Sequence, residues 1–337
     1  MVYPWHSDQF NALLGRLDRL PHALLLRGRE GIGKLAFAEA LARSLLCESP
    51  LPGRGACGRC AACAWMKQGS HPDFRRLEPE SLAEEGDPEQ GGGAKASRQI
   101  PVERIRSIAD FINLSGHRGR AKVALIHPAE ALNVNAANAL LKNLEEPPPR
   151  TYFLLVAHRW HQLLPTIRSR CEQIALPSPS RAVTLEWLKR QDLNDAELAL
   201  GQAGGAPLVA VKFDAEYWKQ RGSLLNAFAA ADFDALGVAD RLRETSPALV
   251  VGWLQKWSFD LVTHKVTGRV HFNPDFVATV TSVAARVDLI DVLRFHRQMV
   301  QMQRIVAHPL NPRLLLEHLL LTYSALLRRV PRLQHAG

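Results

Sequence analysis

The stretch ALLLRGREGIGKL, residues 23–35, decides the fold. An apolar run ends in glycine, a glycine-rich turn follows, and residues 33–46 then show helical periodicity. Gly28, Gly33 and Lys34 have the spacing of a phosphate-binding loop. In such a loop glycines let backbone N–H groups surround the phosphates, and the lysine reaches the outer ones. The stretch therefore predicts an α/β domain built from a strand, a phosphate loop and a helix.

The positions that would bind Mg²⁺ depart from this pattern. A working loop carries Ser or Thr after the lysine, because its hydroxyl holds the metal, and this chain has Leu35. A later strand should end in an acidic residue, but the apolar run at 121–127 ends in His127 and continues into proline. Glu130 lies farther on and is more typical of a helix N-terminus. We therefore expect ATP to be unbound or only weakly bound, without turnover.

The rest of the first half alternates strand-like and helix-like segments. This alternation predicts a mostly parallel sheet with helices on both faces. Residues 80–97 are polar and glycine-rich, and we expect them to form a mobile surface loop. The expected strands are 73–79, 121–127 and 151–157 beside the first at 23–28, and the expected helices are 33–46, one that starts at Pro101, and 133–146.

The pattern changes near PSPS at 177–180, which indicates a hinge. Beyond it the sequence shows amphipathic helices and no convincing alternation of strands. We expect a phosphate-loop domain at 1–176, a small helical domain at 177–213 and a helical domain at 214–337. The clearest helical segments of the last domain are 248–262, 288–306 and 312–329.

Composition places the chain among ordinary globular proteins but does not select a partner. It has 337 residues, of which 47% are hydrophobic and 22% charged. The net charge of +9 permits a nucleic-acid or an acidic protein partner. No apolar run reaches the length of about 18 residues that a membrane span needs, and the start, MVYPWHSDQF, lacks the pattern of a secretory signal. We expect a cytoplasmic protein.

A cluster of cysteines at 47–63 predicts a metal centre. In a reducing compartment such a cluster indicates metal or redox chemistry before disulfides. Its spacings of nine, two and two residues suit tetrahedral zinc, and four thiolates would leave no open position, so we expect a structural role. The alternatives are an iron–sulfur cluster, a redox pair, free buried thiols, or His71 in place of one cysteine. The four residues are Cys47, Cys57, Cys60 and Cys63.

With these features, the chain resembles the delta-prime family of bacterial DNA polymerase III clamp-loader subunits, which are AAA+ proteins. The resemblance covers nearly the whole length. The motifs that carry it are the defective phosphate loop at 28–35, the four-cysteine module at 47–63, HPD at 71–73, NALLKNLEEPP at 138–148, LLPTIRSRC at 163–171 and LNPRLLLEHLLL at 310–321.

The resemblance implies an AAA+ domain, a helical lid and a helical collar that assembles a hetero-pentamer. It implies a stator that does not hydrolyse ATP and helps ATPase motor subunits and the delta subunit to load a sliding clamp onto primed DNA. It also implies that Arg170, with Ser169 and Cys171 in its SRC motif, is an arginine finger supplied in trans to a neighbour's ATP site. Cys171 is expected to be a buried small hydrophobic residue, and Arg168 a surface ion-pair former.

Two further positions belong to this interpretation. His158 follows a strand where active family members place a small polar residue, and Leu208 stands where motor subunits have a second sensor arginine. Leu35, His127 and Leu208 are then three losses from one ATP site. Two other hypotheses remain at this point: a motor subunit that still hydrolyses ATP, and a zinc protein that binds nucleic acid through the cysteine module. The AACAW segment of the module lacks the interleaved basic and aromatic residues that the second hypothesis needs.

Overall fold

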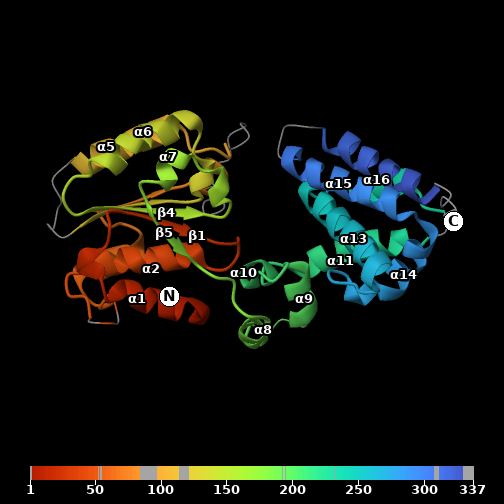
Figure 1. Ribbon diagram of the computed structural model, residues 1–337, viewed down its shortest axis with the longest axis horizontal. Helices are drawn as coiled ribbons and strands as arrows, with labels where there is room; N and C mark the ends of the chain where they lie inside the picture. The colour runs from red at the N-terminus through yellow and green to blue at the C-terminus, as the bar shows by residue number, and fades with distance from the viewer. Residues whose placement is uncertain are drawn as a thin grey trace, which may run out of the picture. The chain divides into compact units, whose positions relative to one another are not determined.

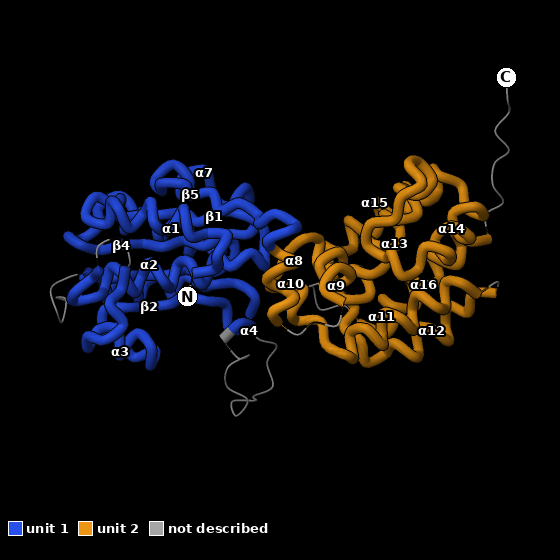
Figure 2. The backbone as a smooth tube through the Cα atoms, turned by 90° about the horizontal axis from the view of Figure 1, so that it is seen from below, with its two compact units in different colours: residues 1–183 blue, residues 184–337 orange. Residues whose placement is uncertain are grey.

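The chain forms two compact units, residues 1–183 and 184–337, which Figure 2 distinguishes by colour. The division of the helical part of the chain into a lid at 177–213 and a collar at 214–337 stays a prediction. The computed structural model describes residues 2–51, 53, 55–83, 97–113, 121–191, 193, 195–230, 232–306 and 311–328.

The first unit is built on a five-stranded parallel sheet with the strand order β2-β3-β4-β1-β5. Every residue of β3 is buried, whereas the edge strands β2 and β5 are partly exposed. The predicted strands are confirmed. β5 was not predicted, because its four residues, EQIA, carry too short an apolar pattern. The strands are β1 (Ala23–Arg27), β2 (Phe74–Leu77), β3 (Lys122–Ile126), β4 (Thr151–Ala157) and β5 (Glu172–Ala175).

Helices cover both faces of this sheet (Figure 1). Successive side chains of a strand point to opposite faces, so Leu24 and Leu26 pack toward α2 while Leu25 packs toward α5 and α6. One layer contains α1 (Ser7–Leu14), α2 (Lys34–Leu46) and α3 (Ala61–Gln68). The other contains α5 (Val102–Asn113), α6 (Val134–Glu145) and α7 (Pro165–Arg168), and the short α4 (Glu80–Ala83) follows β2.

Local sequence explains where α6 begins and ends. The side chain of Asn133 accepts a hydrogen bond from the backbone N–H of Ala136 at 2.8 Å, which caps the first turn. The helix ends at Glu145, just before three prolines that cannot continue it. The predicted helices at 33–46, after Pro101 and at 133–146 are thereby confirmed. Of the predicted loop at 80–97, residues 80–83 form α4, and residues 84–96 lie outside the described residues.

The second unit contains helices, and its described residues include no strand. Together with the parallel sheet of the first unit, this confirms the predicted fold class. Trp253 and Trp257 are buried in its core, as expected of helix-packing residues. No helix in the described part of the chain is long and apolar enough to cross a membrane. The helices are α8 (Arg181–Lys189), which begins in the first unit, α9 (Ala196–Gln202), α10 (Pro207–Ala210), α11 (Ala215–Phe228), α12 (Ala235–Arg241), α13 (Pro247–Thr267), α14 (Val277–Arg286), α15 (Leu289–Ile305) and α16 (Pro312–Arg328).

A buried arginine organises the polar part of this second core. The side chain of Arg221, on α11, is 2% exposed and donates to both carboxylate oxygens of Asp275, at 2.7 and 2.8 Å. It also donates to Oδ1 of Asn273 at 2.8 Å, and Asn273 in turn donates to the buried Asp260 at 2.7 Å. A buried charge needs such partners, so we assign Arg221 a structural role.

Candidate functional site

The phosphate loop lies at the carboxyl edge of the sheet, between β1 and α2. Gly33 has φ +97°, a region that glycine adopts readily. A Cβ at this position would lie 2.3 Å from Cδ2 of Tyr3, so the ring excludes any larger residue. Tyr3 stacks on Trp5, with ring centroids 4.9 Å apart, and Trp5 Nε1 donates to the carbonyl of Ile32 at 2.9 Å. The N-terminal segment therefore packs directly on the loop.

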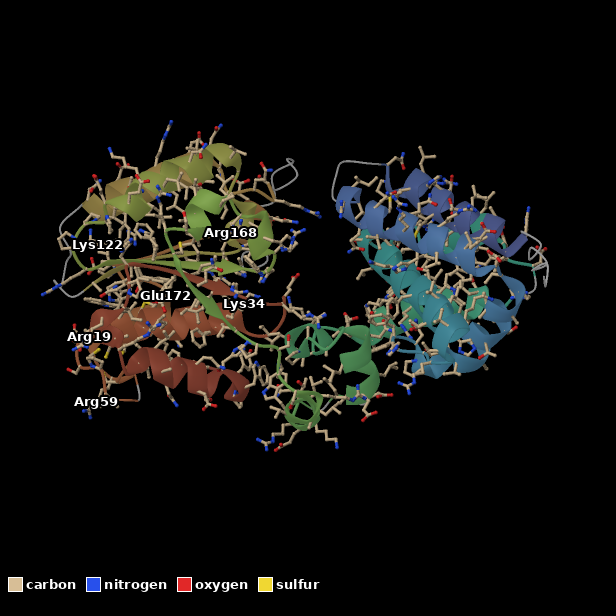
Figure 3. All side chains as sticks on the ribbon, viewed as in Figure 1. Arg19, Lys34, Arg59, Lys122, Arg168 and Glu172 are labelled. Carbon is tan, nitrogen blue, oxygen red and sulfur yellow. The ribbon has the colours of Figure 1, made fainter. Side chains whose placement is uncertain are left out.

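Lys34 is the first residue of α2 (Figure 3) and is only 2% exposed. Its ammonium group donates to the backbone carbonyl of Arg29 in its own loop. Burial lowers the pKa of Lys34 to about 8, against the opposing influence of Glu130 and Glu30. Leu35 packs partly buried against the core between the sheet and α2. The lysine is thus engaged by its own chain, and the next side chain cannot bind a metal.

Two histidines occupy the ends of the adjacent strands. His127 follows β3, and its Nδ1 lies 2.9 Å from Oε1 of Glu78 at the end of β2. His158 follows β4, and its ring centroid lies 5.2 Å from that of His127. Burial, together with electrostatic interactions with Lys34 and His127, lowers the pKa of His158 to about 3. His158 is therefore neutral at pH 7.

Glu130 and Glu78, two of the carboxylates at this edge, are already engaged by protein donors. Glu130 accepts from the backbone N–H groups of His158 at 3.0 Å and Arg159 at 2.8 Å, so it fixes the turn after β4. Burial of Glu78 is outweighed by its hydrogen bonds with His127 and Arg76, which lower its pKa. Sequence reasoning missed both roles. Glu78 could have been found, because it and His127 follow neighbouring parallel strands and must meet at one edge.

The four cysteines come together, as predicted. Their Sγ atoms all lie within 4.8 Å of one another, and those of Cys47 and Cys60 are 3.9 Å apart. A tetrahedron of zinc–sulfur bonds of ~2.3 Å places its sulfurs ~3.8 Å apart, so the donor set fits zinc. The backbone N–H of Cys57 donates to Cys47 Sγ at 3.2 Å, and Gly58 makes the following turn with φ +74°. Among the described residues, no other group of three or more His, Cys, Asp or Glu side chains meets in this way.

His71 lies outside this cluster. Its Nδ1 accepts from the backbone N–H of Asp73 at 3.0 Å, so the HPD sequence forms the turn before β2. This arrangement supports four cysteine ligands over a set in which His71 replaces one of them.

Arg170 lies at the opposite edge of the sheet from the phosphate loop. The loop follows the carboxyl end of β1, whereas Arg170 precedes the amino end of β5, which pairs in parallel with β1 (Figure 3 labels Lys34, after β1, and Glu172, the first residue of β5). The strand between them is ~16 Å long, at 3.3 Å per residue. Arg170 forms an ion pair with Glu145 at the end of α6, and its Nη1 donates to the carbonyl of Thr166 at 3.1 Å. Its side chain is 35% exposed.

The neighbours of Arg170 are held more firmly. Cys171 is buried, as predicted, and burial raises the pKa of its thiol to about 12. Ser169 donates to the carbonyl of Thr166 at 3.1 Å. Arg168 lies over the ring of Trp160, at 5.5 Å, and makes no ion pair among the described residues, in contrast to the expected surface pair.

The structure thus brings the predicted residues together in three separate places. Leu208 lies in the first turn of α10, in the second unit, and is not placed relative to these sites. The carboxyl edge has Gly28, Gly33, Lys34, Leu35, His127 and His158; the metal centre has Cys47, Cys57, Cys60 and Cys63; the amino edge has Ser169, Arg170 and Cys171.

Fold and site define an α/β phosphate-loop protein whose loop lacks its metal ligand, with a four-cysteine module and a helical second unit. Residues 7–180 match the family model described as DNA polymerase III, delta subunit, and residues 215–324 match the one described as DNA polymerase III, delta subunit, C terminal. The chain is 37% identical over 274 residues to DNA polymerase III subunit delta' of Pseudomonas aeruginosa, with 79% of each chain covered.

Two further relatives agree with this match. The chain is 35% identical to the delta' subunit of Yersinia pestis, with 84% of this chain and 83% of the relative covered, and 36% identical to that of Escherichia coli, with 67% and 65% covered. A gamma subunit-related protein of Thermotoga maritima is structurally similar, with a TM-score of 0.45, 19% identity, and 96% of this chain and all of that chain covered. The chain belongs to the family of DNA polymerase III delta' subunits.

Proposed function

We propose that this chain is a clamp-loader subunit that does not hydrolyse ATP and that supplies Arg170 in trans to the ATP site of a neighbouring ATPase subunit. The observation that carries this proposal is the placement of Arg170 and the phosphate loop at opposite edges of one sheet. An arginine side chain does not span the intervening strand of ~16 Å. Arg170 therefore cannot serve its own loop, but it is exposed to a neighbour.

The chemistry of the side chain suits this role. A guanidinium group is charged at any working pH and presents a planar fork that matches phosphate oxygens. Such a group, aimed at the charge that develops during phosphoryl transfer, stabilises the transition state. Arginine fingers supplied in trans accelerate related reactions by about 10³–10⁵-fold.

The chain's own phosphate loop supports the other half of the proposal. Lys34 donates a hydrogen bond to its own loop, and Leu35 offers no metal ligand. His127 occupies the position where an acidic residue would stand, and it forms a hydrogen bond with Glu78. Without a metal ligand the site lacks the ion that would polarise an attacking water and help to neutralise the phosphates. We therefore infer no turnover and absent or weak ATP binding by the isolated chain.

We further propose that the four cysteines bind one structural zinc. Zinc would join the loop at 47–63 to the end of α2, since Cys47 directly follows that helix. Four protein ligands leave no open position for a substrate or a reactive water. Protein purified without added metal is expected to contain one zinc per chain by elemental analysis. A value clearly below one would contradict this assignment.

The second unit supports the proposal of assembly. Several large apolar side chains of α15 and α16 are exposed and are available to contact a partner. We propose that residues 214–337 join the motor subunits and the delta subunit in a hetero-pentamer, which opens a sliding clamp and places it on primed DNA. The exposed residues include Ile290, Leu293, Leu314 and Leu321.

The test of the finger is Arg170→Ala in a clamp loader reconstituted with its ATPase subunits. Assembly should be intact by gel filtration, and DNA-stimulated ATP turnover should fall by about 10³-fold at the site that Arg170 completes. Arg190→Ala is the control, because Arg190 is an exposed arginine paired with Glu186 on α8. Unchanged turnover in the Arg170→Ala loader would refute the finger.

The test of the inactive loop is ATP binding and turnover by the isolated chain in the presence of Mg²⁺. We expect no turnover, and weak binding that does not depend on the metal. Robust turnover would mean that the chain is itself an ATPase motor, and it would overturn the proposal.

A further inference from the structure

The ion pair between Arg170 and Glu145 joins two elements whose backbones are held in place. Helix α6 packs through Leu140 and Leu144, and α7 through Ile167, into the same core on one face of the sheet. The backbone N–H of Arg170 donates to the carbonyl of Ile167 at 3.1 Å, and the chain enters β5 two residues later. Because the backbone is fixed on both sides, the part of Arg170 that is free to move is its side chain.

The pair itself is weak. The two side chains are 35% and 49% exposed, and exposed ion pairs contribute little to stability. Glu145 is also the last residue of α6, where the helix dipole disfavours a negative charge. Neither the helix nor the core therefore needs this carboxylate. What it does contact is the guanidinium of Arg170.

We propose that Glu145 is the resting counter-ion of the arginine finger, which Arg170 exchanges for the phosphates of the neighbour's nucleotide. This inference rests on the proposed function. A nucleoside triphosphate carries more negative charge and more acceptor oxygens than one carboxylate, so the guanidinium fork favours the phosphates once they are in reach. Glu145 is half exposed and returns to water at little cost. It acts through Arg170 and is thus a positioning residue.

Glu145→Gln removes the competing charge and keeps the size of the side chain. In the reconstituted loader, we expect kcat/KM for ATP to rise by up to about fivefold, the range that a weak exposed ion pair allows. Glu146→Gln is the matched control, because Glu146 is the exposed neighbour at the same helix end. The gain should vanish when Glu145→Gln is combined with Arg170→Ala, and it should shrink as salt screens the pair.

The two levels of the proposal fail in different ways. If Arg170→Ala alone leaves turnover unchanged, the finger role of Arg170 and the counter-ion role of Glu145 are both refuted. If Arg170→Ala depresses turnover but Glu145→Gln behaves like Glu146→Gln, the finger stands and the counter-ion is refuted. A fall in kcat/KM with Glu145→Gln would also refute it, because the carboxylate would then orient the finger productively instead of competing for it. The same response in the Arg170→Ala background would show that Glu145 acts on something else.

Discussion

Arg221 and Arg170 show that this protein uses the arginine side chain in two different ways. Arg221, in the second unit, is 2% exposed and makes a two-pronged ion pair with Asp275 and a hydrogen bond with Asn273. Arg170, in the first unit, is 35% exposed and pairs with a half-exposed glutamate. The first arrangement is too costly to break for Arg221 to leave it. The second leaves a guanidinium that is accessible from outside the chain.

The same contrast separates the two edges of the sheet. At the carboxyl edge the chain bonds its own groups: Lys34 to its loop, His127 to Glu78, and Glu130 to the turn after β4. These contacts lie where a nucleotide site would be. At the amino edge Arg170 is left accessible. The two edges therefore differ in how firmly their charged groups are held within the fold.

Breaking the buried pair should have the largest effect on stability. Asp275→Ala leaves the charge of Arg221 buried with only part of its partners, which costs about 3–5 kcal/mol. The melting temperature measured by calorimetry should fall by roughly 10 °C. Glu186→Ala, which breaks an exposed pair on α8, is the control and should stay within about 0.5 kcal/mol. A small loss of stability with Asp275→Ala would show that the ion pair of Arg221 does not hold the fold of the second unit together.

Substitution of Lys34 should have an intermediate effect on stability, and this effect should depend on pH. Its pKa is lowered to about 8 in the folded chain, whereas in the unfolded chain a lysine titrates near 10.4. Below about pH 8 both states bind the proton, and the folded state carries the full cost of a buried charge. Between about pH 8 and 10.4 the unfolded state binds more protons, so the stability of the wild type rises with pH through this window.

Lys34→Met removes this cost. Near pH 7 the variant should be more stable than the wild type by at most about 3 kcal/mol, because a methionine buries well but leaves the carbonyl of Arg29 without its donor. The difference should shrink as the pH rises to about 10. Urea unfolding at several pH values measures it, with the exposed Lys189→Met as control. A constant difference across this range would show that the amine of Lys34 is not buried as a charge.

Much of the first unit could be predicted from the sequence, because its signals are local. Strands such as β3 and β4 are continuous apolar runs, and the loop at 28–35 has fixed spacing, so the carboxyl-edge residues follow from the rule that parallel strands end at one edge. The cysteines were found in the same way, since their spacing alone places four thiolates around one centre.

What could not be predicted depends on contacts between distant residues. Tyr3 packs on Gly33, 30 positions away, and no periodic pattern in the N-terminal segment predicts this contact. The place of Glu145 at a helix end follows from the three prolines after it, but its pairing with Arg170 needs the packing of α6 against α7. The burial of Arg221 was also missed, because an arginine in a polar stretch of a helix is usually exposed.

Arg170→Ala is expected to have the smallest effect on stability. Its effect shows whether Arg170, unlike Arg221, is dispensable for the fold. Both members of its ion pair are at least one-third exposed, so the substitution should change the free energy of unfolding by less than about 1 kcal/mol. Calorimetry of the isolated chain should therefore give a melting temperature within a few degrees of the wild type, although the same variant is expected to disable the reconstituted loader. If Arg170→Ala instead lowered stability as much as Asp275→Ala does, Arg170 would be a second structural arginine, and a loss of turnover could be attributed to misfolding. A stable variant with lost turnover leaves only an interaction outside the chain to explain the effect, because nothing inside the fold has changed.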